Sequence, residues 1–154
     1  MIELPEPVHI IGIKLRTTND NGQSFTDIPP FWQRFMENTC AAQIPAKISD
    51  DIYSVYTHFE NEGKNNQGMY TMIIGCQVKS GTKPPKGFTD VTIPASHYRV
   101  FPVEKGRADQ VGEAWQAIWA IPSSEKKNWS FHCEFERYKS TGEIDIFIGI
   151  KTAK

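Results

Sequence analysis

Residues 131–150, FHCEFERYKSTGEIDIFIGI, have the pattern of two β-strands joined by a tight turn. Side chains alternate between the two faces of a strand, so the odd-numbered and even-numbered residues of the first run are separated. The odd-numbered side chains are apolar: Phe131, Cys133 and Phe135. The even-numbered side chains are polar: His132, Glu134, Glu136 and Tyr138. The first strand is therefore predicted to have one core face and one face that carries chemistry.

The register of this hairpin follows from its turn. A two-residue turn at Thr141 and Gly142 would place Phe135 opposite Ile148 and Glu136 opposite Phe147. On this register a carboxylate lies beside an aromatic ring, on a face that does not look like core. That pairing is the main functional signal in the sequence.

Length, charge and cysteine content restrict the possible classes of protein. The chain of 154 residues is expected to form one domain, 1–154, with a core that needs no metal or disulfide. It has 17 basic and 18 acidic side chains and no basic run, which argues against nucleic acid and membranes as partners. Three widely spaced cysteines in apolar surroundings indicate reduced thiols. The N-terminus lacks a signal-peptide pattern, so a soluble cytoplasmic protein is expected.

Two halves of the chain show the same order of elements. Strand, helix, strand and strand are predicted at 8–17, 27–36, 52–59 and 69–78, with Asp27 capping the helix. A second set is predicted at 91–103, 111–119 and the terminal hairpin, with Pro94 interrupting the start of its first strand. We therefore predict repeat one at 1–80, a linker at 81–87 and repeat two at 88–154.

Short residue matches support this duplication. Phe31-Trp32-Gln33 aligns with Ala114-Trp115-Gln116, and Ile74-Gly75 aligns with Ile148-Gly149. A duplicated β-α-β-β unit implies an α+β fold, with two helices on one face of a mostly antiparallel sheet and a cleft between the repeats. The polar face of residues 132–138 is then assigned to the other face of the sheet, away from the helices.

The same residues carry a resemblance to a known superfamily. Its motifs are Ile93-Pro94-Ala95, Tyr98-Arg99-Val100-Phe101, Gly106, the helix of Trp115 and Phe135-Glu136-Arg137-Tyr138, with Tyr56, Tyr70 and Gly75 at the corresponding places of the first repeat. In order and spacing they resemble the gyrase-inhibitor-like, AraC-type effector-binding domains, which include the ligand-sensing domains of multidrug-responsive transcription activators.

The resemblance implies a function and a site. Family members hold an acidic residue of a Phe-Glu-x-Tyr pattern in an aromatic pocket between the repeats, and that pattern falls on Glu136. The sequence has no room for the helix-turn-helix domain of the activators, so it resembles the stand-alone members, including a binder of cationic drugs encoded on a mobile integron cassette. Direct binding to DNA is not expected.

The residues argue for a cation site independently of the resemblance. A carboxylate withdrawn from water is costly unless it is paired, and aromatic faces attract cations by about 0.5 to 2 kcal/mol per contact. The predicted ligand is therefore a hydrophobic cationic small molecule. The predicted ligand-binding residues are Glu136, Phe147, Tyr138, Tyr56, Tyr98, Trp115, Trp119 and Glu134.

Several of these assignments have structural alternatives. Glu134 either forms a carboxylate pair with Glu136 or lies exposed at the rim. Trp115 and Trp119 line either the cleft or the core, whereas Trp32 and Phe35 are most simply core residues of the first helix. A strand Glu such as Glu136 is usually a solvated surface residue.

Two other classes of function remain open. Glu136 would serve as the general base of a small-molecule hydrolase if Tyr98, Tyr138 or His132 lay within about 3 Å of the reacting atom or one water away. A protein inhibitor of the gyrase-inhibitor type would need an exposed patch, which the sequence does not mark. Spacings for a metal site, a nucleophile elbow or a phosphate loop do not occur, so no catalytic residue, metal or cofactor is predicted.

Overall fold

The computed structural model describes residues 2–151. Its strands are β1 (Ile2–Leu4), β2 (Val8–Thr18), β3 (Ile52–Thr57), β4 (Met69–Gln77), β5 (Thr89–Ile93), β6 (Ser96–Val103), β7 (Trp129–Tyr138) and β8 (Ile144–Ile150). Its helices are α1 (Gln23–Glu37), α2 (Cys40–Gln43) and α3 (Val111–Trp119), with short 3-10 turns η1 (Asp20–Gly22), η2 (Ala108–Gln110) and η3 (Ser123–Glu125). None of the helices in this described part is long and apolar enough to cross a membrane.

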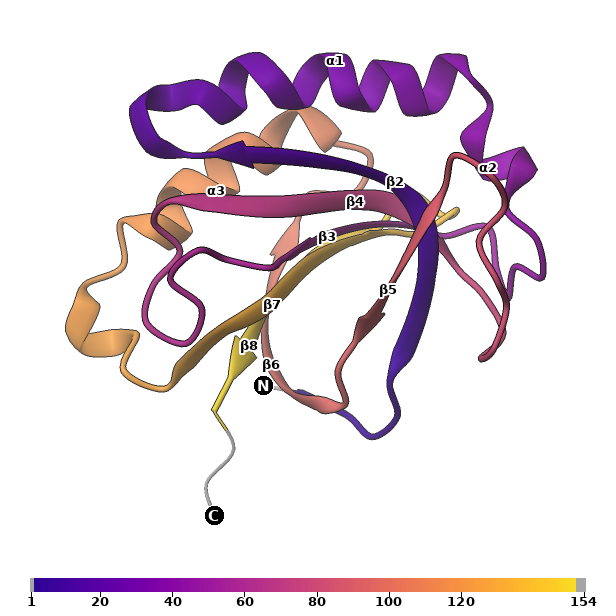
Figure 1. Ribbon diagram of the computed structural model, residues 1–154. Helices are drawn as coiled ribbons and strands as arrows, with labels where there is room; N and C mark the ends of the chain where they lie inside the picture. Colours follow the sequence, from indigo (N-terminus) through magenta and orange to yellow (C-terminus); the bar gives the residue numbers. More distant parts are fainter. Residues whose placement is uncertain (1, 152–154) are drawn as a thin grey trace.

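The strands form one curled antiparallel sheet in the order β1-β6-β8-β7-β3-β4-β2-β5 (Figure 1). The order is symmetric about the pair β7 and β3, because β8 and β6 follow β7 in the same way that β4 and β2 follow β3. Together with α1 and α3, these six strands make two β-α-β-β units. The predicted α+β fold with a duplicated unit is confirmed. The boundaries 1–80, 81–87 and 88–154 stay predictions.

The two units exchange their outermost strands. Pro94 separates the strand predicted at 91–103 into β5 and β6, since proline removes a hydrogen-bond donor from the ladder. β5 then pairs with β2 of the first unit, while β1 at the start of the chain pairs with β6 of the second unit. Each unit thus completes the edge of the other.

The predicted register of the terminal hairpin is wrong by one residue. The structure pairs Phe135 with Phe147 and Glu136 with Ile146. The backbone amide of Lys139 donates to the carbonyl of Glu143 over 2.9 Å, which leaves a three-residue loop at 140–142 instead of a two-residue turn. A shift of one residue reverses the face of every partner side chain. Phe147 therefore lies on the face opposite Glu136.

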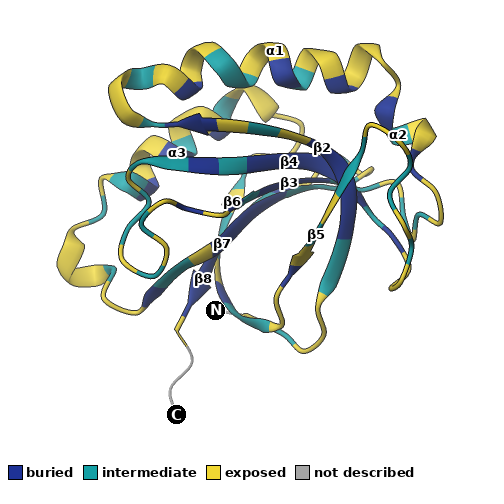
Figure 2. Ribbon diagram, in the orientation of Figure 1, coloured by how far each residue is buried: buried dark blue, intermediate teal, exposed yellow. Residues whose placement is uncertain are grey.

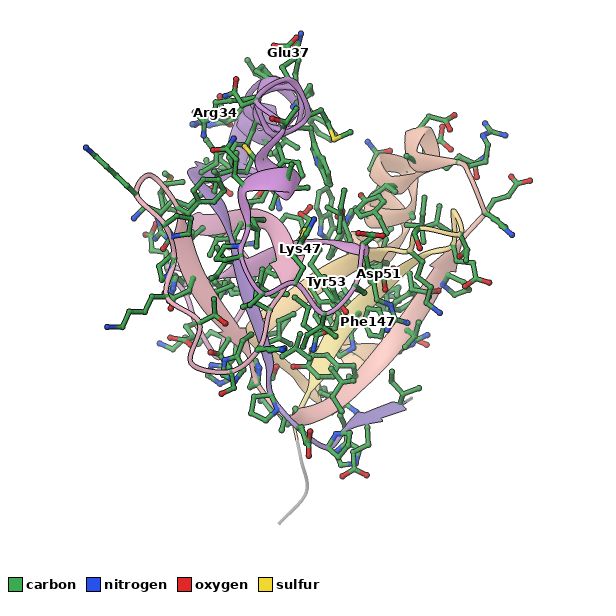
Figure 3. The ribbon with its side chains drawn as sticks, turned by 90° about the vertical axis from the view of Figure 1, so that its right-hand side faces the viewer. Arg34, Glu37, Lys47, Asp51, Tyr53 and Phe147 are labelled. Atoms are coloured by element: carbon green, nitrogen blue, oxygen red, sulfur yellow. The ribbon has the colours of Figure 1, made fainter. Side chains whose placement is uncertain are left out.

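The concave side of the curled sheet is filled by an aromatic and aliphatic core. Phe135 and Phe147 stack there at 4.3 Å between ring centroids, and Tyr98 packs edge-on against Phe135. Figure 3 shows Phe147 beside Tyr53, away from Arg34 and Glu37 on α1. The buried members of this core are Ile10, Tyr53, Val55, Ile73, Ile93, Tyr98, Cys133, Phe135 and Phe147. Both units contribute to it.

The start of β7 departs from simple alternation. An irregularity in the pairing of β7 with β8 lies between Trp129 and Glu134, and Phe131 has a φ of 50°. As a result Phe131 packs with the helix-side cluster of Trp129, whereas Cys133 and Phe135 face the concave core. The prediction that these three side chains share one face is wrong for Phe131.

Helices α1 and α3 both cover the convex face of the sheet (Figure 1). The helix surfaces that face the sheet are buried and their outer surfaces are exposed (Figure 2). Glu134 and Glu136 lie on this helix-covered face, with Ile146 and Ile148 as their neighbours on β8. Their predicted assignment to a face without helices is therefore wrong, because it depended on the misplaced register.

The first helix begins earlier than predicted. It starts at Gln23 directly after Gly22, whose φ of 71° suits glycine. Asp27 is therefore inside α1 and does not cap it. Its carboxylate accepts hydrogen bonds from the hydroxyl of Thr17 at 2.8 Å and from the side-chain amide of Gln23 at 3.1 Å. Asp27 thus links α1 to β2.

Candidate functional site

A cavity of about 380 Å³ lies between α1 and α3, above β3, β4 and β7. This volume is in the range typical of small-molecule sites. The residues that line it are mostly apolar or aromatic: Asn19, Ser24, Phe25, Ile28, Pro29, Trp32, Tyr56, Phe59, Asn66, Tyr70, Ala108, Val111, Gly112, Trp115, Trp119, Glu134, Glu136 and Tyr138. The described residues that line the cavity include two carboxyl groups and no lysine, arginine or histidine.

The two walls come from matching positions of the two units. Four residues of the α1 wall correspond to four of the α3 wall with a constant difference of 83 in residue number. The pairs are Phe25 and Ala108, Ile28 and Val111, Pro29 and Gly112, Trp32 and Trp115. The second unit supplies the smaller side chain in three of these pairs, so the duplicated walls leave more room on the α3 side.

Glu136 lies on the floor of the cavity and is 1% exposed. Its Oε2 accepts hydrogen bonds from the hydroxyl of Tyr56 and the indole N–H of Trp115, both at 2.6 Å, and its Oε1 accepts one from the hydroxyl of Tyr138 at 2.5 Å. Burial raises the pKa of Glu136, and the three hydrogen bonds act in the opposite direction. Glu136 thereby joins β3, α3 and β7 in one polar network.

The phenols around Glu136 remain protonated donors at neutral pH. Burial and the charge of Glu136 raise the pKa of Tyr56 and of Tyr138. Each hydroxyl therefore offers a proton to the carboxylate, and the network fixes the orientation of both rings. The Tyr138 ring also packs edge-on against Trp32 at 5.2 Å, which extends the network to α1.

Glu134 is also buried, at 4% exposure, but its surroundings differ. Among residues 2–151, no side chain or backbone group forms a hydrogen bond or ion pair with its carboxyl group. Burial raises the pKa of Glu134 to about 7, and the positive charge of Lys126 opposes this shift. The main cause is therefore burial and not repulsion within a carboxylate pair. Exposure at a rim, the other predicted alternative, is wrong.

The structure brings six of the predicted ligand-binding residues to this cavity and places two elsewhere. Those at the cavity are Glu136, Tyr138, Tyr56, Trp115, Trp119 and Glu134. Phe147 and Tyr98 belong to the concave core on the opposite face, and the Tyr98 hydroxyl donates to the carbonyl of Pro94 at 2.7 Å. Because both side chains lie on that opposite face, neither can contact a ligand in this cavity. Phe147 was assigned to the site through the wrong register, and Tyr98 through its aromatic character.

Several lining residues were missed by the sequence analysis. Trp32 was interpreted as core, yet it lines the cavity opposite Trp115. The alignment of Phe31-Trp32-Gln33 with Ala114-Trp115-Gln116 already contained this signal, because equivalent residues of a duplicated fold face a shared cleft. Tyr70 packs edge-on against Tyr56 at 5.8 Å and donates to Asn19 at 2.9 Å. The long separation of Asn19 and Tyr70 in sequence gave no signal for that contact.

Other potentially reactive groups lie outside the cavity. His132 is exposed and contacts Glu62 at 2.9 Å, and the three cysteines are buried free thiols. Of the partners considered for a general base, only Tyr138 has its hydroxyl within reach of Glu136, and that hydroxyl already donates to the carboxylate. Within the described range, no group of three or more His, Cys, Asp or Glu side chains has the arrangement of a metal site.

A duplicated antiparallel sheet, covered on one face by two helices with a cavity between them, defines the gyrase-inhibitor-like class of effector-binding folds. The structure of SAV2435 bound to tetraphenylphosphonium has this fold, with a TM-score of 0.76 and 18% sequence identity over 95% of this chain and 90% of that one. A family model described as "Integron-associated effector binding protein" and named Cass2 matches residues 1–150. The chain belongs to this integron-associated effector-binding family.

Two relatives are named as transcriptional regulators, "Putative transcriptional regulator protein YobU" and "Transcriptional regulator BrlR". YobU of Bacillus subtilis is 24% identical over 151 residues, which are 91% of this chain and 90% of that protein. The transcriptional regulator BrlR of Pseudomonas aeruginosa is 26% identical over 134 residues, which are 80% of this chain and 46% of BrlR. The chain therefore spans nearly all of YobU and about half the length of BrlR.

Proposed function

We propose that this protein captures hydrophobic cationic small molecules in the cavity between α1 and α3, as a sensor or a sequestering protein. One observation carries the proposal: an aromatic cavity contains two buried carboxyl groups and no basic side chain among its described lining residues. An apolar cation compensates buried negative charge and also loses little hydration when it enters. A neutral or anionic ligand of the same shape lacks this advantage.

The aromatic walls favour the same class of ligand. Trp32 and Trp115 stand at equivalent positions on the two helices, and Tyr56, Tyr70 and Tyr138 line the sheet side of the cavity. Each well-placed ring contributes about 0.5 to 2 kcal/mol of attraction to a cation, in addition to apolar contact. Affinity is thus expected from buried area, and selectivity from charge. The tetraphenylphosphonium bound to SAV2435 belongs to this chemical class.

Two ions of nearly equal shape and opposite charge test the proposal. Isothermal titration calorimetry at pH 8 compares tetraphenylphosphonium with tetraphenylborate. We expect a micromolar Kd for the phosphonium, about −8 kcal/mol, and binding of the borate that is weaker by at least about 100-fold. Equal affinities for the two ions would contradict charge recognition. Failure of the phosphonium to bind would contradict the proposal as a whole.

A further inference from the structure

The cavity contains two buried carboxyl groups that differ in their hydrogen bonds. Glu136 accepts three hydrogen bonds, from Tyr56, Trp115 and Tyr138. Glu134, two residues earlier on β7 and on the same face, accepts none from any residue in the described range 2–151. The carboxyl oxygens of Glu134 are not fully enclosed by protein, and Glu134 lines the cavity, so a ligand that enters the cavity can reach them directly.

The hydrogen bonds of Glu136 restrict what that group can do for a ligand. Two donors bind Oε2 and one binds Oε1, so side chains of the cavity walls already take three of the roughly four lone-pair positions of this carboxylate. Its negative charge is already stabilised by fixed dipoles from β3, α3 and β7. Substitution of Glu136 would therefore disturb Tyr56, Trp115 and Tyr138 together, and would affect ligands of every charge.

No residue in the described part of the chain forms a hydrogen bond with the carboxyl group of Glu134. Across the sheet its neighbours are Tyr56 on β3 and Ile148 on β8. Among residues 2–151, the opposite charge that acts on it is that of Lys126, whose Nζ donates to the carbonyl of Trp119 at 2.7 Å and lies 5.4 Å from the Trp129 ring centroid. Lys126 is thus held by other contacts. A carboxylate in such a position is stabilised most by a cation that enters the cavity.

We propose, on the basis of the proposed function, that Glu134 is the carboxylate that neutralises the bound cation, that Glu136 positions the aromatic walls, and that cation binding expels a proton from Glu134. Because burial raises the pKa of Glu134 to about 7, the carboxyl group is partly protonated at neutral pH in the empty cavity. A bound cation favours the ionised form and lowers that pKa. The proton leaves to solvent, and the protein exchanges one positive charge for another.

The other titratable groups near Glu134 do not account for a proton that is released when a cation binds. Burial raises the pKa of Tyr70 to about 12, and that of Tyr56 well above its ordinary value, so both phenols stay neutral from pH 5.5 to 8.5. The charges of Glu136, Glu134 and Asp27 add to the effect of burial on the pKa of Tyr70, and the charge of Lys126 opposes the effect of burial on the pKa of Glu134. Glu136 is the remaining acid nearby, and a variant at each glutamate separates the two. The helix α3 contributes tryptophans to this wall and no titrating side chain.

The experiment measures the Kd of tetraphenylphosphonium from pH 5.5 to 8.5, since the charge of this ion does not depend on pH. In the wild type we expect affinity to fall by up to about tenfold per pH unit below pH 7 and to level off above pH 8. Glu134→Gln should bind the ion at least about tenfold more weakly at pH 8, with a flat profile. Titration at pH 6 in two buffers of different ionisation enthalpy should show proton release for the wild type and none for Glu134→Gln.

Matched controls keep the result interpretable. Glu6→Gln removes an exposed carboxylate far from the cavity and should retain the wild-type profile. Neutral triphenylphosphine oxide should bind Glu134→Gln and the wild type equally, which verifies that the walls are intact. Glu136→Gln should weaken the neutral and the cationic ligand alike, and its remaining phosphonium binding should keep the pH dependence.

The outcomes separate this inference from the proposed function. If the wild type prefers tetraphenylphosphonium over tetraphenylborate but Glu134→Gln keeps the wild-type affinity and pH profile, the role of Glu134 is wrong and the function stands. If Glu136→Gln alone loses the cation and spares the neutral ligand, the roles of the two glutamates are reversed and the inference is overturned. If the wild type shows no charge preference, the proposed function itself fails.

Discussion

Glu134 and Glu136 have nearly the same sequence context and different environments. Strand alternation predicted that they share a face, and they do. Their partners could not be predicted, because Tyr56 and Trp115 lie 80 and 21 residues away from Glu136 in sequence. The sequence therefore identified carboxyl groups with a shared orientation. Which of them is hydrogen-bonded depends on how β3 and α3 pack around them.

The unpartnered burial of Glu134 has a consequence for the stability of the empty protein. Its pKa is about 7 in the fold against an ordinary value of 4.5, so the folded state binds the proton more tightly than the unfolded chain does. The free energy of unfolding therefore decreases as pH rises from about 4.5 to 7. Glu134→Gln removes this effect. Above pH 7 the variant should be more stable than the wild type by at most about 3 kcal/mol.

Thermal unfolding of both proteins between pH 4.5 and 8 tests this prediction. The difference in Tm should be small at pH 4.5 and should grow with pH, by roughly 2 to 4 °C for each kcal/mol. Glu6→Gln, which changes an exposed side chain, should follow the wild type throughout. A variant that is less stable than the wild type at pH 8 would show that the carboxylate has a favourable partner in the empty cavity.

At the scale of elements, periodicity located most helices and strands because each has a buried face with a regular spacing. The errors concern the face on which a side chain lies, and they arose where one additional residue in a loop or bulge reverses that face. The loop at 140–142 has three residues instead of two, and this moved Phe147 to the wrong face. The bulge before Glu134 likewise places Phe131 on the face opposite the predicted one. Turn geometry of this kind depends on backbone conformation that a single sequence does not specify.

The equivalence of α1 and α3 predicts which tryptophans report on the ligand. Trp32 and Trp115 line the cavity at matching positions, whereas Trp129 is buried in a cluster outside the lining. Tetraphenylphosphonium should quench tryptophan fluorescence, and Trp32→Phe should remove part of the quench while the binding site is retained. Trp129→Phe is the matched control and should leave the quench unchanged. A quench that disappears only in Trp129→Phe would place the ligand elsewhere.

At the scale of the whole molecule, duplication explains both the fold and the position of the site. The cavity lies where the two units meet, and the concave core mixes side chains of both, such as Tyr53 with Phe147. The sequence contained the repeat, and the predicted α+β architecture followed from it. The exchange of β1 and β5 was not predictable, because nothing in a short edge strand specifies which half it joins.

This exchange predicts that neither repeat is stable alone. A chain cleaved within the loop 79–88 should remain one cooperative unit, because β5 completes the first unit and β1 the second. The separately expressed fragments 1–80 and 88–154 should each lack a cooperative thermal transition by circular dichroism and should regain one when mixed. A cooperative transition in either isolated fragment would contradict a single domain.

The crystal structure of the complex with tetraphenylphosphonium at pH 8 is the most direct test of the proposed site. The phosphonium should lie between α1 and α3, with phenyl rings against Trp32 and Trp115 and with Glu134 as the nearest carboxylate. Glu136 should keep its hydrogen bonds from Tyr56, Trp115 and Tyr138. A phosphonium bound outside this cavity, or one that displaces those three donors to reach Glu136, would contradict the account.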